Sequence, residues 1–134
     1  MPVNNLIVVV TFIALLVYLW TGLRVGAARG KFGVPAPAIS GAPEFERAWR
    51  VQMNTLEWLP LFLPSLWLFA WYWDPRVAAG VGAVWILARV MYAITYANDP
   101  AKRGPWFGLQ ALSTGVLLFG ALGKAAWQLY LGGV

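Results

Sequence analysis

Cysteine and histidine are both absent from this 134-residue sequence, and their absence narrows its chemistry. Without cysteine the chain forms no disulfide, holds no iron–sulfur cluster and has no thiol nucleophile of its own. Without histidine it lacks the commonest metal ligand and the usual acid–base group at neutral pH. Five acidic residues alone are a poor metal-binding set, so we expect no metal site. Any thiol chemistry must therefore come from a cosubstrate.

Charged residues are also scarce, at 11% of the sequence, whereas a soluble domain has about 25%. Hydrophobic residues make up 60% of the chain, which is typical of a membrane protein. The net charge of +5 would suggest nucleic-acid binding in a soluble protein. Here the basic residues flank apolar runs, which is the pattern of topology control, and no solvated basic face is available. We therefore expect membrane lipids, and no nucleic acid, as partners.

Four segments are long and apolar enough to be membrane spans, since the bilayer core needs about 20 helical residues. We predict helices at about residues 4–27, 45–73, 77–98 and 105–131. The first of them lacks the basic start of a cleaved signal peptide. Residues 28–43 are rich in proline and glycine and are predicted to form a loop. The predicted fold class is all-α: one integral membrane domain over residues 1–134, built as a four-helix bundle.

Basic residues are distributed unevenly between the predicted loops. With four spans, the loops after the first and third helices share one side of the membrane. That side collects Arg24, Arg29, Lys31, Arg47, Arg50, Lys102 and Arg103. The opposite side carries only Arg76 and Lys124. The positive-inside rule therefore predicts that these two loops are cytoplasmic and that both termini lie on the other side.

Polar side chains form stripes on the second and third predicted helices. At 100° per residue, one arc of roughly 100° on the second helix contains Glu46, Arg47, Arg50, Asn54 and Glu57. The stripe on the third helix consists of Arg89, Tyr92 and Tyr96. Charged groups at this depth normally face a bundle interior or a water-filled cavity, and they mark function.

These stripes have two interpretations. Embedded charges can simply hold a bundle together, with Glu57 paired to Arg89 or Arg50. That pairing leaves a surplus of arginines over the single deep carboxylate. Excess positive charge beside one carboxylate, an amide and tyrosine hydroxyls suits a zwitterionic ligand that carries more carboxylates than amines.

Residues 45–62, FERAWRVQMNTLEWLPLF, closely resemble the pattern of the membrane-associated proteins in eicosanoid and glutathione metabolism, the MAPEG family. The pattern E-R-x-x-R-x-x-x-N-x-x-E on the second of four helices is matched by the stripe that runs from Glu46 to Glu57. The resemblance extends through LARVMYAITYA, residues 87–97, and the arginine of AKRGP, residues 101–105. It implies a homotrimer of four-helix bundles, with glutathione as cosubstrate bound between subunits near the cytosolic face.

The resemblance also implies roles for individual residues. One subunit would line the glutathione site with Arg50, Asn54, Glu57, Tyr92, Tyr96 and Arg103, and the next subunit would add Arg29 and Gln52. The arginines would hold the carboxylates of glutathione, and Glu57 its α-ammonium. Arg103, the implied catalytic residue, would face the sulfur. Gln52 points away from the Arg50 stripe on a helical wheel, which agrees with a role across an interface.

The implied activity is that of a membrane-bound glutathione transferase with a role in detoxification. A thiol with a pKa of about 8.5 is only slightly ionised at pH 7, and a guanidinium within about 4–6 Å can lower that pKa by roughly 1–3 units. The thiolate would attack lipophilic electrophiles from the bilayer, and lipid hydroperoxides are second candidate substrates. Trp58 and Gly30 differ from the residues of some relatives, and they favour a general transferase over a specialised leukotriene synthase.

Three other functions stay open at this point: a non-catalytic family member, a small exporter and a prostaglandin E synthase-like isomerase. A non-catalytic, lipid-binding member of the same family would share the fold but would not activate glutathione. Small four-helix drug exporters resemble the chain in size, although they carry their essential glutamate in the first helix, which here is uncharged. Glutathione activation separates the first alternative from a transferase, and proton-coupled transport would reveal the second.

Overall fold

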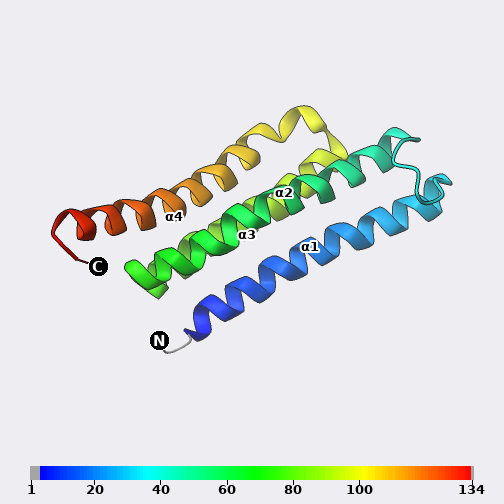
Figure 1. Cartoon of the computed structure of the whole chain (residues 1–134). Helices are drawn as coiled ribbons and strands as arrows, with labels where there is room; N and C mark the ends of the chain where they lie inside the picture. The colour runs from blue at the N-terminus through cyan, green and yellow to red at the C-terminus, as the bar shows by residue number, and fades with distance from the viewer. Residues whose placement is uncertain (1–3, 134) are drawn as a thin grey trace.

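The computed structural model describes residues 4–133, and within them the chain is all-α, as predicted. The elements are α1 (Asn5–Phe32), α2 (Pro43–Tyr72), α3 (Pro75–Asn98), the 3₁₀ turn η1 (Pro100–Lys102) and α4 (Gly104–Tyr130). Helices α2 and α3 lie at the centre of the bundle, and α1 and α4 flank them (Figure 1). This arrangement places residues of the second and third helices next to each other, as the polar stripes require.

Three of the four helices in the described part of the chain have the length and hydropathy of a membrane span: α1, α3 and the η1–α4 segment. Helix α2 is 30 residues long, but Pro60, Pro64 and its charged first half lower its hydropathy. Prolines and charges in a helix this long suit a helix that packs between other helices rather than against lipid alone. These features indicate an integral, multi-pass membrane protein, and α2 as a fourth span stays a prediction.

Short capping motifs determine where the helices begin. The Asn4 side chain accepts a hydrogen bond from the Leu6 amide at 3.0 Å. Asp74 does the same for the Arg76 amide at 2.6 Å, directly before Pro75. Proline suits the first helical turn because its missing N–H would have no partner there. Asp99 caps η1 in the same way, through the Ala101 amide at 3.1 Å.

Helix α1 ends later than the sequence predicts. It continues through Phe32 and ends at Gly33, whose φ of 66° is the left-handed conformation that glycine adopts easily. The predicted loop from residue 28 therefore begins five residues later. The added turn is stabilised by packing, because Phe32 joins a small apolar cluster around Val34 and Phe45. The other three helices agree with their predicted bounds within two residues.

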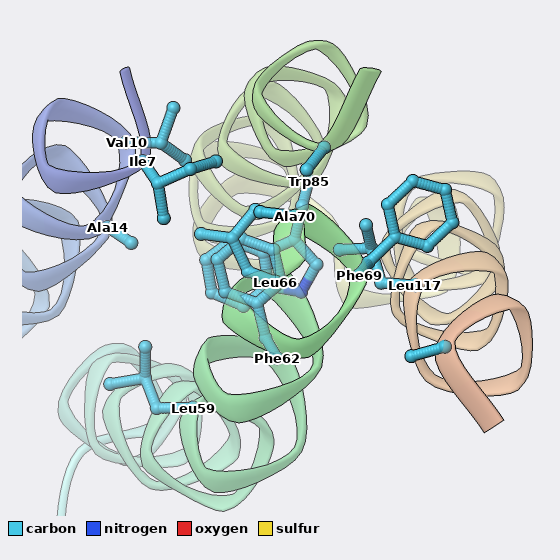
Figure 2. Packing of buried hydrophobic residues seen from close by; sticks show 12 residues of the cluster. Ile7, Val10, Ala14, Leu59, Phe62, Leu66, Phe69, Ala70, Trp85 and Leu117 are labelled. Carbon is cyan, nitrogen blue, oxygen red and sulfur yellow. The ribbon is translucent and has the colours of Figure 1, made fainter. Parts of the chain in front are cut away.

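The apolar core lies in the half of the bundle away from the basic loops. Phe62 of α2 stacks on Trp85 of α3, with ring centroids 4.0 Å apart. Ile7 and Val10 of α1 close one side of this stack, and Leu117 of α4 closes the other (Figure 2). All four helices therefore contribute to one core, which holds α2 and α3 in a defined relative rotation.

Gly82 of α3 allows α1 and α2 to approach closely. A Cβ at this position would lie 2.7 Å from Val10 Cγ1 and 3.1 Å from Leu66 Cδ1. We expect Gly82→Ala to destabilise the fold by about 1–2 kcal/mol, since overpacking typically costs 1–3 kcal/mol. Gly80→Ala is the matched control, because a Cβ there meets nothing within 4 Å. Thermal unfolding in detergent should show a lower midpoint for Gly82→Ala only, and equal midpoints for both variants would contradict this packing.

The connections after α1 and after α3 lie at the same end of the bundle, and α1 begins and α4 ends at the opposite end (Figure 1). The two basic segments therefore lie near one another, as four antiparallel spans require. This geometry agrees with the predicted loop arrangement. Which end faces the cytoplasm stays a prediction.

Candidate functional site

A cavity of about 250 Å³ lies at the basic end of the bundle, where α2, α3 and the first turns of α4 meet. Its lining residues are Arg50, Asn54, Tyr92, Tyr96, Arg103 and Phe107. The first five belong to the set that the sequence singles out. They come from three helices, and their side chains converge because the core below them fixes the rotation of α2 against α3.

The buried half of this site is organised around Arg89. Its side chain is only 1% exposed, and both terminal nitrogens donate to Asn54 Oδ1, Nη1 at 2.9 Å and Nη2 at 2.8 Å. Nη2 also lies 3.2 Å from Thr55 Oγ1. The guanidinium carbon lies 4.4 Å from the centre of the Tyr92 ring. Arg89 therefore supports the cavity wall from behind and adds positive charge to it.

Glu57 pairs with Arg50 rather than with Arg89. Arg50 Nη1 and Glu57 Oε1 are 3.4 Å apart, and both side chains are 54% exposed. An ion pair this exposed contributes about 0–1 kcal/mol. Glu57 lies on the outer face of α2, outside the cavity lining, and its carboxylate is available to a ligand at small energetic cost. The pairing of embedded charges thus explains Glu57 in part, but among the described residues 4–133 Arg89 has no carboxylate partner.

Arg103 lies at the start of α4, beside the cavity. Its Nη1 donates to the Pro100 carbonyl at 2.6 Å, and its guanidinium carbon lies 5.4 Å from the centre of the Tyr96 ring. The Tyr92 and Tyr96 rings are 5.6 Å apart. The side chain is exposed, so its charge can turn towards a ligand without unpacking the bundle. This placement fits a cation that acts on a group bound in the cavity.

Phe107 lines the cavity, although it is not among the site residues predicted from the sequence. Its ring is 6.0 Å from Tyr92 and 5.5 Å from Trp58, in an edge-on contact with the latter. Phe107 lies one helical turn after Arg103, so the i, i+4 spacing was the signal that could have identified it. It supplies an apolar wall beside two tyrosines, which suits the apolar part of a ligand or a substrate from the bilayer.

Arg29 and Gln52 lie outside the cavity within this chain. Arg29 Nη1 donates to the Ala38 carbonyl at 2.7 Å, and its guanidinium carbon lies 4.8 Å from the centre of the Phe45 ring. It anchors the loop after α1. Gln52 packs against Gly22 of α1, where a Cβ would approach its Nε2 to 3.0 Å. Neither residue belongs to the lining of the cavity in the same chain, and a role in a neighbouring subunit stays a prediction.

The cavity has the electrostatic character of an anion site. Two arginines line it and a third lies behind it, while none of its lining residues is acidic. Tyrosine hydroxyls and the Asn54 amide add neutral hydrogen-bonding groups. Arginine binds carboxylates well because its planar fork of donors matches their geometry. The site can hold an anionic ligand next to an apolar wall.

Residues 7–123 match the MAPEG family over most of the chain. The chain belongs to the MAPEG family. A relative from Synechocystis, an uncharacterized protein, is 50% identical over 120 residues, which cover 90% of this chain and 88% of the relative. Human microsomal glutathione S-transferase 2 is 42% identical over 107 residues, or 77% of this chain and 71% of the relative. Bovine leukotriene C4 synthase is 38% identical over 94 residues, which cover 70% of this chain and 63% of the relative.

The MAPEG match contains every residue that was predicted to act in the site, from Arg29 to Arg103. The resemblance noted in the sequence is therefore confirmed at the level of the family. The human relative is named as a glutathione S-transferase, whereas the relative with 50% identity is named only as an uncharacterized protein.

Proposed function

We propose that this MAPEG protein is an integral membrane glutathione transferase that binds glutathione at the cavity between α2, α3 and α4. The observation that carries the proposal is the convergence of Arg50, Arg103 and two tyrosines on one basic cavity of about 250 Å³. Glutathione has two carboxylates and one amine, so a site with excess arginine matches its charge. The 42% identity to human microsomal glutathione S-transferase 2 supports the choice of this ligand.

In this proposal the chain's own residues bind the tripeptide and ionise its thiol. Arg50 binds a carboxylate of glutathione. Glu57 gives up part of its contact with Arg50 and binds the α-ammonium of glutathione instead. Arg103 turns from the Pro100 carbonyl towards the sulfur and stabilises the thiolate, while the thiol proton passes to water. The sulfur then forms a bond to the electrophilic carbon of the substrate, and the leaving group departs with its electron pair. Phe107 and Tyr92 form the apolar wall for that substrate.

Lipid hydroperoxides are a second proposed substrate class for the same thiolate. Two glutathiones would supply two electrons: the hydroperoxide becomes an alcohol and water, and the glutathiones become their disulfide. Both reactions need the same activated sulfur, so the same cavity serves both. Substrates dissolved in the bilayer would enter sideways between helices.

We further propose that the active form is a homotrimer, in which Arg29 and Gln52 of each subunit complete the site of the next one. The cavity of one chain, at about 250 Å³, is smaller than the roughly 300–1,000 Å³ of typical ligand sites. A neighbouring subunit could therefore enlarge the site by adding a further wall to it. We expect native mass measurement in detergent to find three chains together with bound glutathione. An active monomer would contradict the shared site.

The proposed topology places the two basic loops in the cytoplasm, where glutathione would reach the cavity. Seven basic residues at that end support this orientation through the positive-inside rule. We expect reporter fusions at the C-terminus to show a location outside the cytoplasm. A cytoplasmic signal from the C-terminal fusion would overturn the orientation.

Titration calorimetry of the detergent-solubilised protein with glutathione, followed by a conjugation assay with a chloronitrobenzene, tests the proposed function. We expect saturable binding and enzyme-dependent release of chloride. Binding without conjugation would favour a non-catalytic, lipid-binding member of the family. Absence of binding would overturn the proposal.

A further inference from the structure

Asn54 separates the buried Arg89 from the cavity, and its side-chain amide has a different neighbour on each side. Its oxygen accepts both terminal nitrogens of Arg89, at 2.9 and 2.8 Å. The residue is 8% exposed, and that remaining surface belongs to the cavity wall. Within residues 4–133 the amide nitrogen makes no hydrogen bond, so its two donors are available on the cavity side.

The orientation of this amide follows from the chemistry of its partner. A guanidinium has five donors and no acceptor. If the Asn54 amide were flipped, its NH₂ group would face the NH groups of Arg89, and donors would oppose donors in a buried site. Only the amide oxygen can face Arg89, so the NH₂ group must face the cavity. Asn54 therefore presents donors to a ligand and no acceptor.

The surroundings of Arg89 hold it in this place. Trp85 and Tyr92, one turn to either side on α3, lie 6.0 and 4.4 Å from its guanidinium carbon. Thr55 accepts a further hydrogen bond from Nη2 at 3.2 Å. In the described part of the chain no carboxylate pairs with Arg89, so no acidic group competes for its donors. The arginine is fixed, and the amide that it holds is fixed with it.

We propose that Arg89 is a positioning residue that fixes Asn54 as a hydrogen-bond donor to a carboxylate of bound glutathione. The inference rests on the proposed function, and it adds which group of the ligand Asn54 selects. An unpositioned asparagine could turn its oxygen to the ligand and accept from the ammonium. Because Arg89 occupies the amide oxygen, Asn54 has no acceptor for the ammonium of glutathione, and Glu57 binds that group.

The test measures the affinity of four ligands in detergent by titration calorimetry. They are glutathione, 4-aminobutyryl-Cys-Gly, which lacks the γ-glutamyl carboxylate, γ-glutamyl-Cys-ethylamide, which lacks the glycine carboxylate, and glutaryl-Cys-Gly, which lacks the amine. Asn54→Asp is the first variant. It gives Arg89 a stronger partner, so the fold is retained, and it presents an acceptor to the cavity in place of a donor.

We expect Asn54→Asp to weaken glutathione and the analogue without the amine by about 10-fold or more, because a donor to a charged group is replaced by a repelling oxygen. For one of the two analogues that lack a carboxylate, the same substitution should lower the binding affinity by less than about 3-fold. The carboxylate missing from that analogue is the one that Asn54 contacts. If Asn54 instead accepts from the ammonium, Asn54→Asp strengthens glutathione binding. That result would overturn the proposal.

Arg89→Gln and Arg89→Lys test the positioning step itself. A glutamine at position 89 can donate or accept, so the Asn54 amide is free to take either orientation. We therefore expect the same ligand-dependent loss of affinity, by about 10-fold. Lysine has donors only and should retain most of the affinity. Thr114→Val is the control, because Thr114 is buried but bonds only to the Gln110 carbonyl of its own helix. General damage to the fold would weaken all four ligands equally, and this outcome would contradict a positioning role.

Two results distinguish a wrong proposed function from a wrong role of Arg89 and Asn54. If the wild-type protein binds no glutathione, the proposed function is wrong and this inference falls with it. If the wild type binds glutathione but Asn54→Asp and Arg89→Gln bind all four ligands as the wild type does, the donor role of Asn54 and the positioning role of Arg89 are wrong, and the proposed function stands.

Discussion

Arg103→Ala should lower the turnover number at saturating glutathione by ten-fold or more. Arg103 is the exposed cation at the mouth of the cavity, 5.4 Å from the Tyr96 ring, and it is the proposed partner of the thiolate. If it lowers the thiol pKa by two units, its loss removes about 2.7 kcal/mol of thiolate stabilisation. Steady-state conjugation of a chloronitrobenzene at saturating glutathione measures the effect.

Lys102→Ala is a matched control for this prediction. Lys102 carries the same charge in the same connection, but its side chain is 77% exposed and lies 3.8 Å from Asp99. We expect Lys102→Ala to retain the wild-type turnover, and Arg103→Lys to recover part of the loss because a point charge does not reproduce the planar fork. If both alanine variants behave alike, Arg103 is an ordinary loop charge that orients the protein in the membrane.

Glu57→Gln should weaken glutathione binding by about 10- to 150-fold, which corresponds to the 1.5–3 kcal/mol of a hydrogen bond to a charged group. The substitution keeps the shape of the side chain and removes the charge that would pair with the α-ammonium. The turnover number at saturating glutathione should change less than the affinity, because Glu57 lies outside the cavity wall that would face the sulfur. Titration calorimetry and saturation kinetics separate the two quantities.

The structure also predicts what Glu57→Gln leaves unchanged. The Arg50–Glu57 pair is half exposed on both sides, so its loss should lower the free energy of unfolding by no more than about 1 kcal/mol. Glu44→Gln, in the first turn of the same helix, is the control for a lost carboxylate. A large loss of thermal stability together with unchanged glutathione affinity would mean that Glu57 only holds the bundle together.

The parts of the fold that local chemistry determines were predictable from the sequence. Prolines and capping residues place the starts of α2, α3 and α4 within two residues, because they act on the chain next to them. The end of α1 was not predictable in this way. Gly30 and the prolines after it indicate a loop, but Phe32 packs against the start of α2 and the helix extends through Phe32, with Gly33 as its C-cap.

The sequence predicts which residues gather at the site, but it does not predict which of their side chains contact each other. Helical periodicity places Arg50, Asn54 and Glu57 on one side of α2. Which of them meets Arg89 depends on the rotation of α2 against α3, and the stacking of Phe62 on Trp85 sets that rotation. Phe62 and Trp85 belong to different helices, so no local pattern in either helix reports their contact. Asn54, and not Glu57, turned out to be the partner of Arg89.

The proposed function requires that bound glutathione is held as its thiolate, and a pH titration of the wild-type protein measures this ionisation. Thiolate, the reactive form of a thiol, absorbs at about 240 nm, and S-methylglutathione, which cannot ionise at sulfur, supplies the baseline. We predict a saturable absorbance at pH 7 and a titration midpoint one to three units below the roughly 8.5 of a free thiol. A midpoint equal to that of free glutathione, at saturating occupancy of the site, would contradict the account.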